Sequence, residues 1–431
     1  MDYINFDYIT IDYISSVRRK FDPGFDKGRG LVYAPVPPLL ILRNLEMAES
    51  LLDSAKKFVP LIRANLDKID SDCQLPPELS EAMAQEGLFG LYVPKILGGP
   101  EMDPVTAFPV VEEISKADGS AGWCCFNGSA VTSAVSRISI DAAKELFGDP
   151  LDVRGSGSAR SGGTAKLTQG GYFVSGRWNY LSGVDHAKCL FLNCDVVDDN
   201  GPVRNEDGSP VSRVAIVPVE AGEVHIVWST LGMRGTASND AEFSELFVPT
   251  SHTYSRAEPA LHDNPLYNPQ TAILCSWTLA SANALGMARG AMNAFKDLAT
   301  AGSTTSTTLL RDRTTVQTTV GECEAIIGAG RSYVLDAVGA MWESQTARAP
   351  DLMDKAVHAR LAIAYGIRQS VKVVDMLFYA AGTGAIHQSN RLERYFRDLH
   401  VSGQHISGLH SNYELGGQLL LGAEPTALTY A

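Results

Sequence analysis

The sequence has no run of five or more basic residues, and its 36 lysines and arginines are outnumbered by 49 aspartates and glutamates. The resulting net charge of −13 disfavours nucleic acid and anionic membrane surfaces as partners. No apolar run reaches the roughly 18 residues of a membrane-spanning helix, and no basic N-terminal region precedes an apolar segment. We therefore expect a cytoplasmic protein with no nucleic-acid or membrane partner.

Metal-binding and nucleotide-binding patterns are missing as well. The seven cysteines are scattered and show neither CxxC spacing nor clustering with histidine, so no metal site is predicted. Such a distribution is typical of buried thiols in a reducing compartment. No GxGxxG motif follows a predicted strand, so a redox reaction in this protein needs electrons from a separate source.

The hydrophobic period changes twice along the chain. Apolar positions recur every three or four residues over 45–150, alternate with a period of two over 151–258, and return to helical spacing over 259–431. A chain of 431 residues also exceeds what one hydrophobic core usually organises. The pattern predicts an α+β protein with an N-terminal helical domain, a middle antiparallel β-barrel or sandwich, and a C-terminal four-helix bundle.

Residues 1–44 fit none of these domains. They contain a near-repeat of Asp-Tyr-Ile at positions 2, 7 and 12, followed by glycines and a proline cluster. We expect a flexible N-terminal extension. It is either translated upstream sequence ahead of a start at Met47 or an added interaction arm.

The stretch 155–194 carries the strongest functional signal. GSGSARSGGTAK (155–166) has four glycines and three serines, which allow the backbone to approach a ligand closely. GYFVSGRWNYLSGVDHAKCLFLNC (171–194) predicts two strands joined by a loop that holds Trp178, Tyr180 and Ser182. Hydroxyls, backbone N–H groups and aromatic faces at one end of a sheet are suited to binding a flavin.

Three further motifs resemble the acyl-CoA dehydrogenase fold. They are EGLFGLYVPKILGG (86–99), similar to the segment that closes the second helix of that fold, LGMRGTASNDAEFSELFVP (231–249), similar to the strand pair that ends its middle domain, and LERYFRDLH (392–400), similar to its last long helix. The resemblance implies the helical, β and helical order given above. It also implies a homotetramer, in which the loop Gly382-Thr383-Gly384 would reach a neighbour's flavin.

Within this fold, the motifs GSGSARSGGTA, GGYFVSGRW and SGVDHA are closer to the two-component, reduced-flavin-dependent (group D) monooxygenases than to dehydrogenases. Dehydrogenases need a carboxylate base to remove the weakly acidic α-proton of a thioester. The two positions that carry this base fall on Ile406 and Ser276. The resemblance implies an oxygenase that uses FMNH2 or FADH2 from an NAD(P)H:flavin reductase, and O2, through a C4a-hydroperoxyflavin.

The resemblance also assigns roles to individual residues. Ser182 matches the position that meets the flavin N5 edge, and Tyr180 and Trp178 are expected to border the isoalloxazine. His405, seven residues after Asp398, matches a histidine of the oxygenase branch that hydrogen-bonds a peroxide oxygen or shuttles a proton. Simple structural roles, as a turn serine and a helix histidine, are the alternatives.

Other positions bear on the cofactor and the substrate. Ser156 and Ser158 match a loop that faces substrate and flavin, and Trp123 is expected on the opposite wall or in the core. Val131 stands where phenol hydroxylases of this branch have a histidine. A nucleophilic substrate such as an indole, amine or thioether is therefore favoured over a phenol, within a general class of small aromatics.

Arg311 and Arg313 stand where the dehydrogenases have a segment that holds the dinucleotide part of FAD. Two cations suit a single flavin phosphate, so FMN is favoured and FAD is the alternative cofactor. Surface arginines at a helix start are the structural alternative for this pair.

Two other functions remain open at this point. One is an FAD-dependent enzyme of the acyl-CoA dehydrogenase type with a displaced base. The other is a scaffold of the same fold that binds a ligand or partner without flavin.

Overall fold

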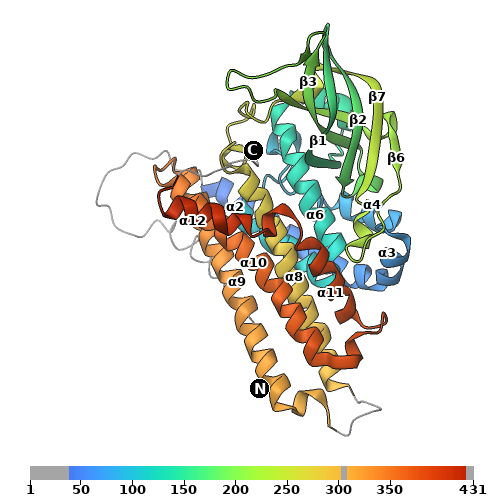
Figure 1. Ribbon diagram of the computed structural model, residues 1–431, viewed down its shortest axis with the longest axis vertical. Coiled ribbons are helices and arrows are strands. Elements are labelled where there is room, and N and C mark those ends of the chain that lie inside the picture. Colours follow the sequence, from blue (N-terminus) through green and yellow to red (C-terminus); the bar gives the residue numbers. More distant parts are fainter. Residues whose placement is uncertain (1–37, 302–307, 424–431) are drawn as a thin grey trace.

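The computed structural model describes residues 38–301 and 308–423, which form two helical regions that pack against each other and, between them in chain order, a β-sheet at one end of the molecule (Figure 1). The N-terminal region contains α2 (Pro38–Ala64), α3 (Leu66–Asp72), α4 (Pro77–Gln85), α5 (Pro104–Ala117), α6 (Gly119–Thr132) and α7 (Ile140–Phe147). Helix α2 begins at Pro38, ahead of the expected boundary at Leu45. Residues 1–37 of the expected extension lie outside the described part of the chain.

Local sequence explains where the central helices begin. The Asp103 carboxylate accepts hydrogen bonds from the N–H groups of Val105 and Thr106 at 2.9 and 3.0 Å and so caps α5. The Asp118 carboxylate does the same for α6 by accepting from the Ala121 N–H at 2.9 Å. Helices α5 and α6 therefore start at fixed points, which sets the register of the α6 side chains that face the sheet.

The middle region is one sheet of eight strands in the order β6-β7-β2-β1-β3-β5-β8, with β4 paired to β3. The strands are β1 (Gly155–Thr168), β2 (Gly171–Leu181), β3 (Cys189–Asp198), β4 (Gly201–Pro202), β5 (Ser212–Pro218), β6 (Glu223–His225), β7 (Asn239–Pro249) and β8 (Thr253–Tyr254). The prediction of an antiparallel domain was wrong in one respect, because β1 and β3 pair in parallel and the sheet is mixed.

The parallel pair has a simple topological cause. Strand β1 lies between β2 and β3 in the sheet. The segment that joins β2 to β3 must therefore pass over the N-terminal end of β1. This crossing segment, residues 182–188, contains Ser182. The first residues of β1 therefore lie directly beside it.

The C-terminal region is a bundle of α8 (Ala272–Thr300), α9 (Thr314–Thr346), α10 (Leu352–Ala381) and α11 (Arg391–Ser402), followed by α12 (Ser411–Leu420). Helix α8 is buried on most sides because it packs against α5 as well as α9, α10 and α11. The predicted C-terminal bundle is confirmed. None of the helices in the described residues combines the length and hydropathy of a membrane span.

The prediction that Trp178 borders a flavin is corrected by its position in the sheet core. Its side chain is 1 % exposed, its Nε1 donates to the Asn193 carbonyl at 2.7 Å, and its ring meets Phe243 edge-on at 6.1 Å. Trp178 lies on the buried face of β2 because side chains alternate between the two faces of a strand. It stabilises the sheet instead of offering a surface to a ligand.

We expect Trp178→Ala to lower the stability of the middle region by about 3–5 kcal/mol, the usual cost of truncating a buried aromatic side chain. Urea unfolding followed by circular dichroism measures this loss. Leu167→Ala, at a half-exposed position of β1, is the matched control and should stay within about 0.5 kcal/mol of the parent protein. Equal losses for both variants would contradict the assignment of Trp178 to the core.

Candidate functional site

Ser182 is the most heavily contacted polar residue at the crossing segment. Its hydroxyl accepts a hydrogen bond from Trp123 Nε1 at 3.1 Å and lies 2.7 Å from the hydroxyl of Ser238. Its carbonyl accepts from Asn127 Nδ2 at 2.9 Å and from the Ser156 hydroxyl at 2.8 Å. Helix α6, strand β1 and the segment before β7 therefore fix both the backbone and the side chain of Ser182.

One face of α6 supplies the helical part of this site. Trp123, Asn127 and Val131 are spaced by four residues, so they lie above one another on the same side of the helix. Val131 is half-buried and faces β1, where a Cβ on Gly157 would lie 3.4 Å from its Cγ1. This face offers an indole N–H, an amide and an apolar end in sequence.

His405 reaches the same place from the C-terminal bundle. It lies after α11, at the start of a short 3₁₀ turn, Ile406–Gly408. Its ring meets Trp123 edge-on, with ring centroids 5.2 Å apart, and Phe126 in the same way at 5.9 Å. The structure therefore places Ser182 and His405 in contact with the same indole ring.

The protonation of His405 differs from the sequence-based expectation. Burial lowers the pKa of His405 to about 4, so the ring is neutral at pH 7 and does not titrate near neutrality. Its Nδ1 accepts from the Ser407 backbone N–H at 3.4 Å and lies 2.7 Å from the Ser407 hydroxyl. These contacts assign the proton of the neutral ring to Nε2, which makes His405 a neutral hydrogen-bond donor.

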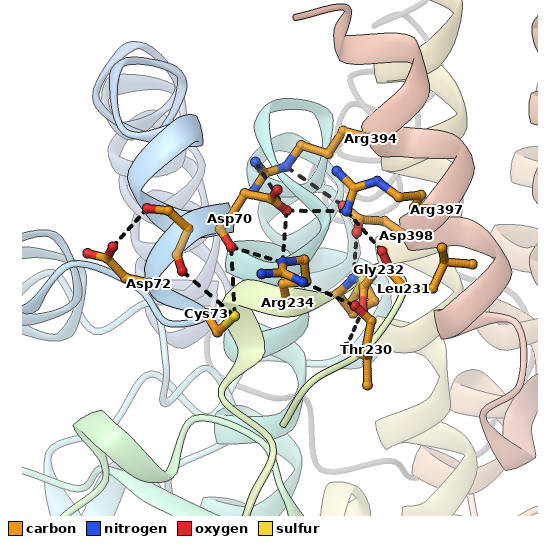
Figure 2. A network of polar contacts seen from close by, with 12 residues as sticks. Asp70, Asp72, Cys73, Thr230, Leu231, Gly232, Arg234, Arg394, Arg397 and Asp398 are labelled. Carbon is orange, nitrogen blue, oxygen red and sulfur yellow. Dashed lines mark hydrogen bonds and ion pairs between the residues drawn. The ribbon is translucent and has the colours of Figure 1, made fainter. Parts of the chain in front are cut away.

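A polar network fixes the segment that leads to Ser238 (Figure 2). The Met233 N–H donates to Asp398 Oδ1 at 2.5 Å, and Arg397 Nη1 donates to the Leu231 carbonyl at 2.9 Å. Between them, Gly232 leaves no room for a side chain, because a Cβ would lie 2.4 Å from the Arg397 backbone. Helix α11 therefore holds residues 231–233 tightly against itself.

The same network reaches the N-terminal region. Arg234 Nε donates to the Asp70 carbonyl of α3 at 2.9 Å, and Arg397 Nη1 lies 3.3 Å from Asp70 Oδ1. Arg394, on the same helix as Arg397, lies 2.7 Å from Asp118, the cap of α6. All three regions of the protein are thus tied together next to the site.

Three further predicted residues lie around Ser182 in different ways. Tyr180 is 54 % exposed, with the Arg160 guanidinium over its ring at 5.6 Å from the ring centre and Trp228 edge-on at 6.2 Å. Ser156 is fully buried and donates to Ser182, which corrects the expectation that it faces substrate or flavin. Ser158 is half-buried and accepts from the Arg160 N–H at 3.3 Å.

The predicted phosphate-binding and loop residues lie elsewhere in the chain. Arg311 and Arg313 stand between the end of α8 and the start of α9, and Gly382, Thr383 and Gly384 follow α10. These helix ends lie at the end of the bundle away from the sheet (Figure 1). Within one chain, the structure therefore does not bring these residues to Ser182, because the length of the bundle separates them.

A cavity of about 370 Å³ lies at this distal end, lined by residues that include Asp297, Gly384, His387 and Arg391. Arg311 itself is largely exposed, with its Nε 3.7 Å from the Asp312 carboxylate. Neither feature is part of the site at Ser182.

Sequence reasoning missed Asn127, Ser238 and Thr236, whose hydroxyl lies 2.7 Å from that of Ser238. The four-residue spacing from Trp123 was an available signal for Asn127. Nothing in the sequence pointed to the two hydroxyls, since they reach Ser182 only through folding of the 230s segment.

The positions that carry the base in dehydrogenases hold no acid here. The Ser276 hydroxyl donates to the Ala272 carbonyl within α8, and Ile406 is apolar. Among the residues that the structure describes, no group of histidine, cysteine and acidic side chains is arranged to hold a metal ion. The residues at the site suit the polar edge of a flavin instead, because they combine a hydroxyl, an indole N–H and a neutral imidazole.

We expect His405→Phe to flatten the loss of stability in acid. The folded-state pKa of His405 lies below the ordinary value of 6.5, so its contribution is complete above pH 6.5 and is lost as the pH falls to about 4. Unfolding free energies measured between pH 4 and 7.5 should show a shallower slope in this variant. His410→Gln, at an exposed position, controls for loss of an imidazole as such, and a slope unchanged by His405→Phe would contradict the burial argument.

Comparison with known proteins identifies the family. The sequence profile of the acyl-CoA dehydrogenase N-terminal domain matches residues 46–151, and that of the C-terminal domain matches residues 278–408. Indole-3-acetate monooxygenase from Pseudomonas putida is 26 % identical over 378 residues, which cover 88 % of this chain and 94 % of that protein. The oxygenase subunit HsaA of a flavin-dependent monooxygenase from Rhodococcus jostii is 28 % identical over 366 residues, which cover 81 % of this chain and 92 % of that protein.

Solved structures agree with these relatives. XiaF from Streptomyces sp., determined in complex with FADH2 and glycerol, superposes with a TM-score of 0.80 at 26 % identity and covers 90 % of this chain and 99 % of its own. The 3-HSA hydroxylase from Rhodococcus sp. gives a TM-score of 0.78 at 25 % identity, with 88 % and 98 % covered. The two profiles together span more than half of the sequence, so this chain belongs to the acyl-CoA dehydrogenase family and is similar, within it, to flavin-dependent monooxygenases.

Proposed function

We propose that this chain is the oxygenase component of a two-component flavin-dependent monooxygenase. It would receive reduced FMN or FAD from a separate NAD(P)H:flavin reductase and use O2 to hydroxylate a small organic substrate. The observation that carries this proposal is that the Trp123 indole contacts both Ser182, to which its Nε1 donates, and the His405 ring. Two relatives that share most of its length are named as a monooxygenase and as the oxygenase subunit of a flavin-dependent monooxygenase.

The chain's own residues would bind and orient the cofactor and control protons around it. When bound, a reduced flavin supplies the two electrons that O2 requires. Ser182 would meet the N5 edge of the ring, and His405 would donate a hydrogen bond from Nε2 without changing charge. A neutral donor suits a site that must keep water and stray protons away from a reactive oxygen species.

We propose an indole-like compound, another small aromatic, an amine or a thioether as the substrate. The α6 face of Trp123, Asn127 and Val131 would border it, and Val131 supplies an apolar contact in place of a base. A substrate that is already nucleophilic needs no such base, whereas a phenol needs one to become a phenolate.

We further propose a cytoplasmic homotetramer. The loop Gly382–Gly384 and the arginines at 311 and 313 are remote from Ser182 in one chain, so a role at the flavin requires them to come from a neighbouring subunit. Such an arrangement would give each site residues from two copies of the chain.

The oxygenase proposal predicts a transient flavin species. Anaerobic protein with FMNH2, mixed rapidly with oxygenated buffer, should show an absorbance that belongs to neither reduced nor oxidised flavin. Immediate return to oxidised flavin would contradict the proposal. Retention of FAD that acyl-CoA bleaches would favour a dehydrogenase, and lack of affinity for flavin in either redox state would favour a flavin-free scaffold.

We expect Ser182→Ala to shorten the lifetime of this transient about fivefold and to raise peroxide release, since the loss of one hydrogen bond between neutral groups typically costs about 1 kcal/mol. Stopped-flow absorbance and a peroxide assay measure both effects. Ser161→Ala is the matched control, because Ser161 is an exposed residue of β1 whose hydroxyl donates to the Gly163 carbonyl at 3.4 Å, so its loss should leave the lifetime unchanged. A lifetime unaffected by Ser182→Ala would remove Ser182 from the proposed flavin site.

A further inference from the structure

Three buried hydroxyls form a continuous chain behind the site. Thr236, Ser238 and Ser182 are 1 %, 4 % and 8 % exposed, and each neighbouring pair of oxygen atoms is 2.7 Å apart. At one end the Thr236 hydroxyl lies 2.9 Å from the Met233 carbonyl, and at the other end Trp123 Nε1 donates to Ser182 at 3.1 Å. Every hydroxyl of the chain therefore has two polar neighbours within hydrogen-bonding distance.

The groups at the two ends of this series of hydroxyls determine the direction in which each hydroxyl donates its proton. Each hydroxyl has one proton to donate, and a carbonyl can only accept. The Thr236 hydroxyl donates to the Met233 carbonyl, since two lone pairs facing each other at 2.9 Å would repel. Ser238 then donates to Thr236, and Ser182 donates to Ser238.

The Met233 carbonyl is held in place, so the three hydroxyls cannot reverse the direction in which they donate. The Met233 carbonyl also accepts from Trp228 Nε1 at 2.9 Å, and the Met233 N–H is held by Asp398 at 2.5 Å. At the other end, Trp123 N–H can only donate, so it occupies one lone pair of Ser182. The proton of Ser182 is thus committed inward, and its second lone pair is the part left for a ligand.

We propose that Thr236 and Ser238 are positioning residues that make Ser182 a hydrogen-bond acceptor at the flavin N5 edge and thereby select reduced flavin. This inference rests on the proposed function. Reduced flavin carries an N–H at N5, which can donate to the free lone pair of Ser182. Oxidised flavin has only a lone pair at N5. This lone pair would face the lone pair of the Ser182 oxygen with no proton between them, so no hydrogen bond forms.

The chain of hydroxyls thus gives the oxygenase a means of distinguishing the cofactor it consumes from the one it releases. Ser182 alone does not provide this, because an isolated serine hydroxyl rotates to donate or accept as the ligand requires. The selectivity depends on residues that touch no flavin atom.

The test compares the affinity of the full-length protein for reduced and oxidised FMN, measured anaerobically and aerobically by equilibrium titration. In Ser238→Ala, Ser182 loses its inward acceptor and can turn its proton toward oxidised flavin. The ratio of the oxidised to the reduced dissociation constant should fall about fivefold, the effect of one net hydrogen bond. The midpoint potential of bound FMN should then fall by about 20 mV, because tenfold corresponds to ~30 mV for a two-electron couple.

A second pair of variants tests the chain one link further away. Thr236→Val keeps the shape of threonine but removes its hydroxyl, and it should shift the ratio in the same direction. Thr236→Ser keeps the hydroxyl and should retain the parent ratio. Circular dichroism spectra check folding, and the Thr236 pair decides the question if Ser238→Ala does not fold.

The inference is overturned if Ser238→Ala and Thr236→Val bind both forms of FMN with the parent ratio, or if Thr236→Ser shifts the ratio as much as Thr236→Val does. The hydroxyls would then only pack the segment. If the parent protein binds neither form, the proposed function fails first and this inference fails with it.

Discussion

The crossing of the chain over the first residues of β1 is the constraint from which the site follows. Because β1 lies between β2 and β3, residues 182–188 must pass over the N-terminal end of β1. There the Ser156 hydroxyl donates to the Ser182 carbonyl. The same end is covered by α6, whose Trp123 and Asn127 complete the contacts to Ser182. A single topological feature therefore brings a hydroxyl, an indole and an amide together.

Packing between the three regions keeps this arrangement rigid. The 230s segment is clamped to α11 through Asp398 and Arg397 and to α3 through Asp70, and these charges lie at least partly out of water. Removing one charged side chain of such a network leaves the opposite charges buried without a partner. The stability lost in this way is larger than the stability that the intact contacts contribute. The network therefore acts mainly to specify one position for the hydroxyls that follow Met233.

The chemistry of the site is that of neutral groups. His405 is held neutral by burial, Ser182 and Trp123 carry no charge, and the two positions where a dehydrogenase base would stand hold Ser276 and Ile406. Such a site lacks the carboxylate that a dehydrogenase uses to remove a weakly acidic proton, but it can position hydrogen bonds around a cofactor that supplies the reactivity. The family fold is thus compatible with oxygenation once the carboxylate is gone.

The order of helical and strand regions, and the membership in the family, were readable from the sequence because hydrophobic period and short motifs are local properties. The resemblance of short motifs to the family also pointed to Ser182, Tyr180 and His405 as candidate site residues. It failed for Trp178 and Ser156, since alternation along a strand does not say which face is covered. For Arg311 and Arg313 a motif could not show that the length of the bundle separates them from Ser182 within one chain. Only the tertiary structure decided that β1 and β3 are parallel, because this pairing joins residues distant in sequence. It also decided that Thr236 and Ser238 direct the hydroxyl of Ser182, because the loop that carries them is held in place by α11 and α3.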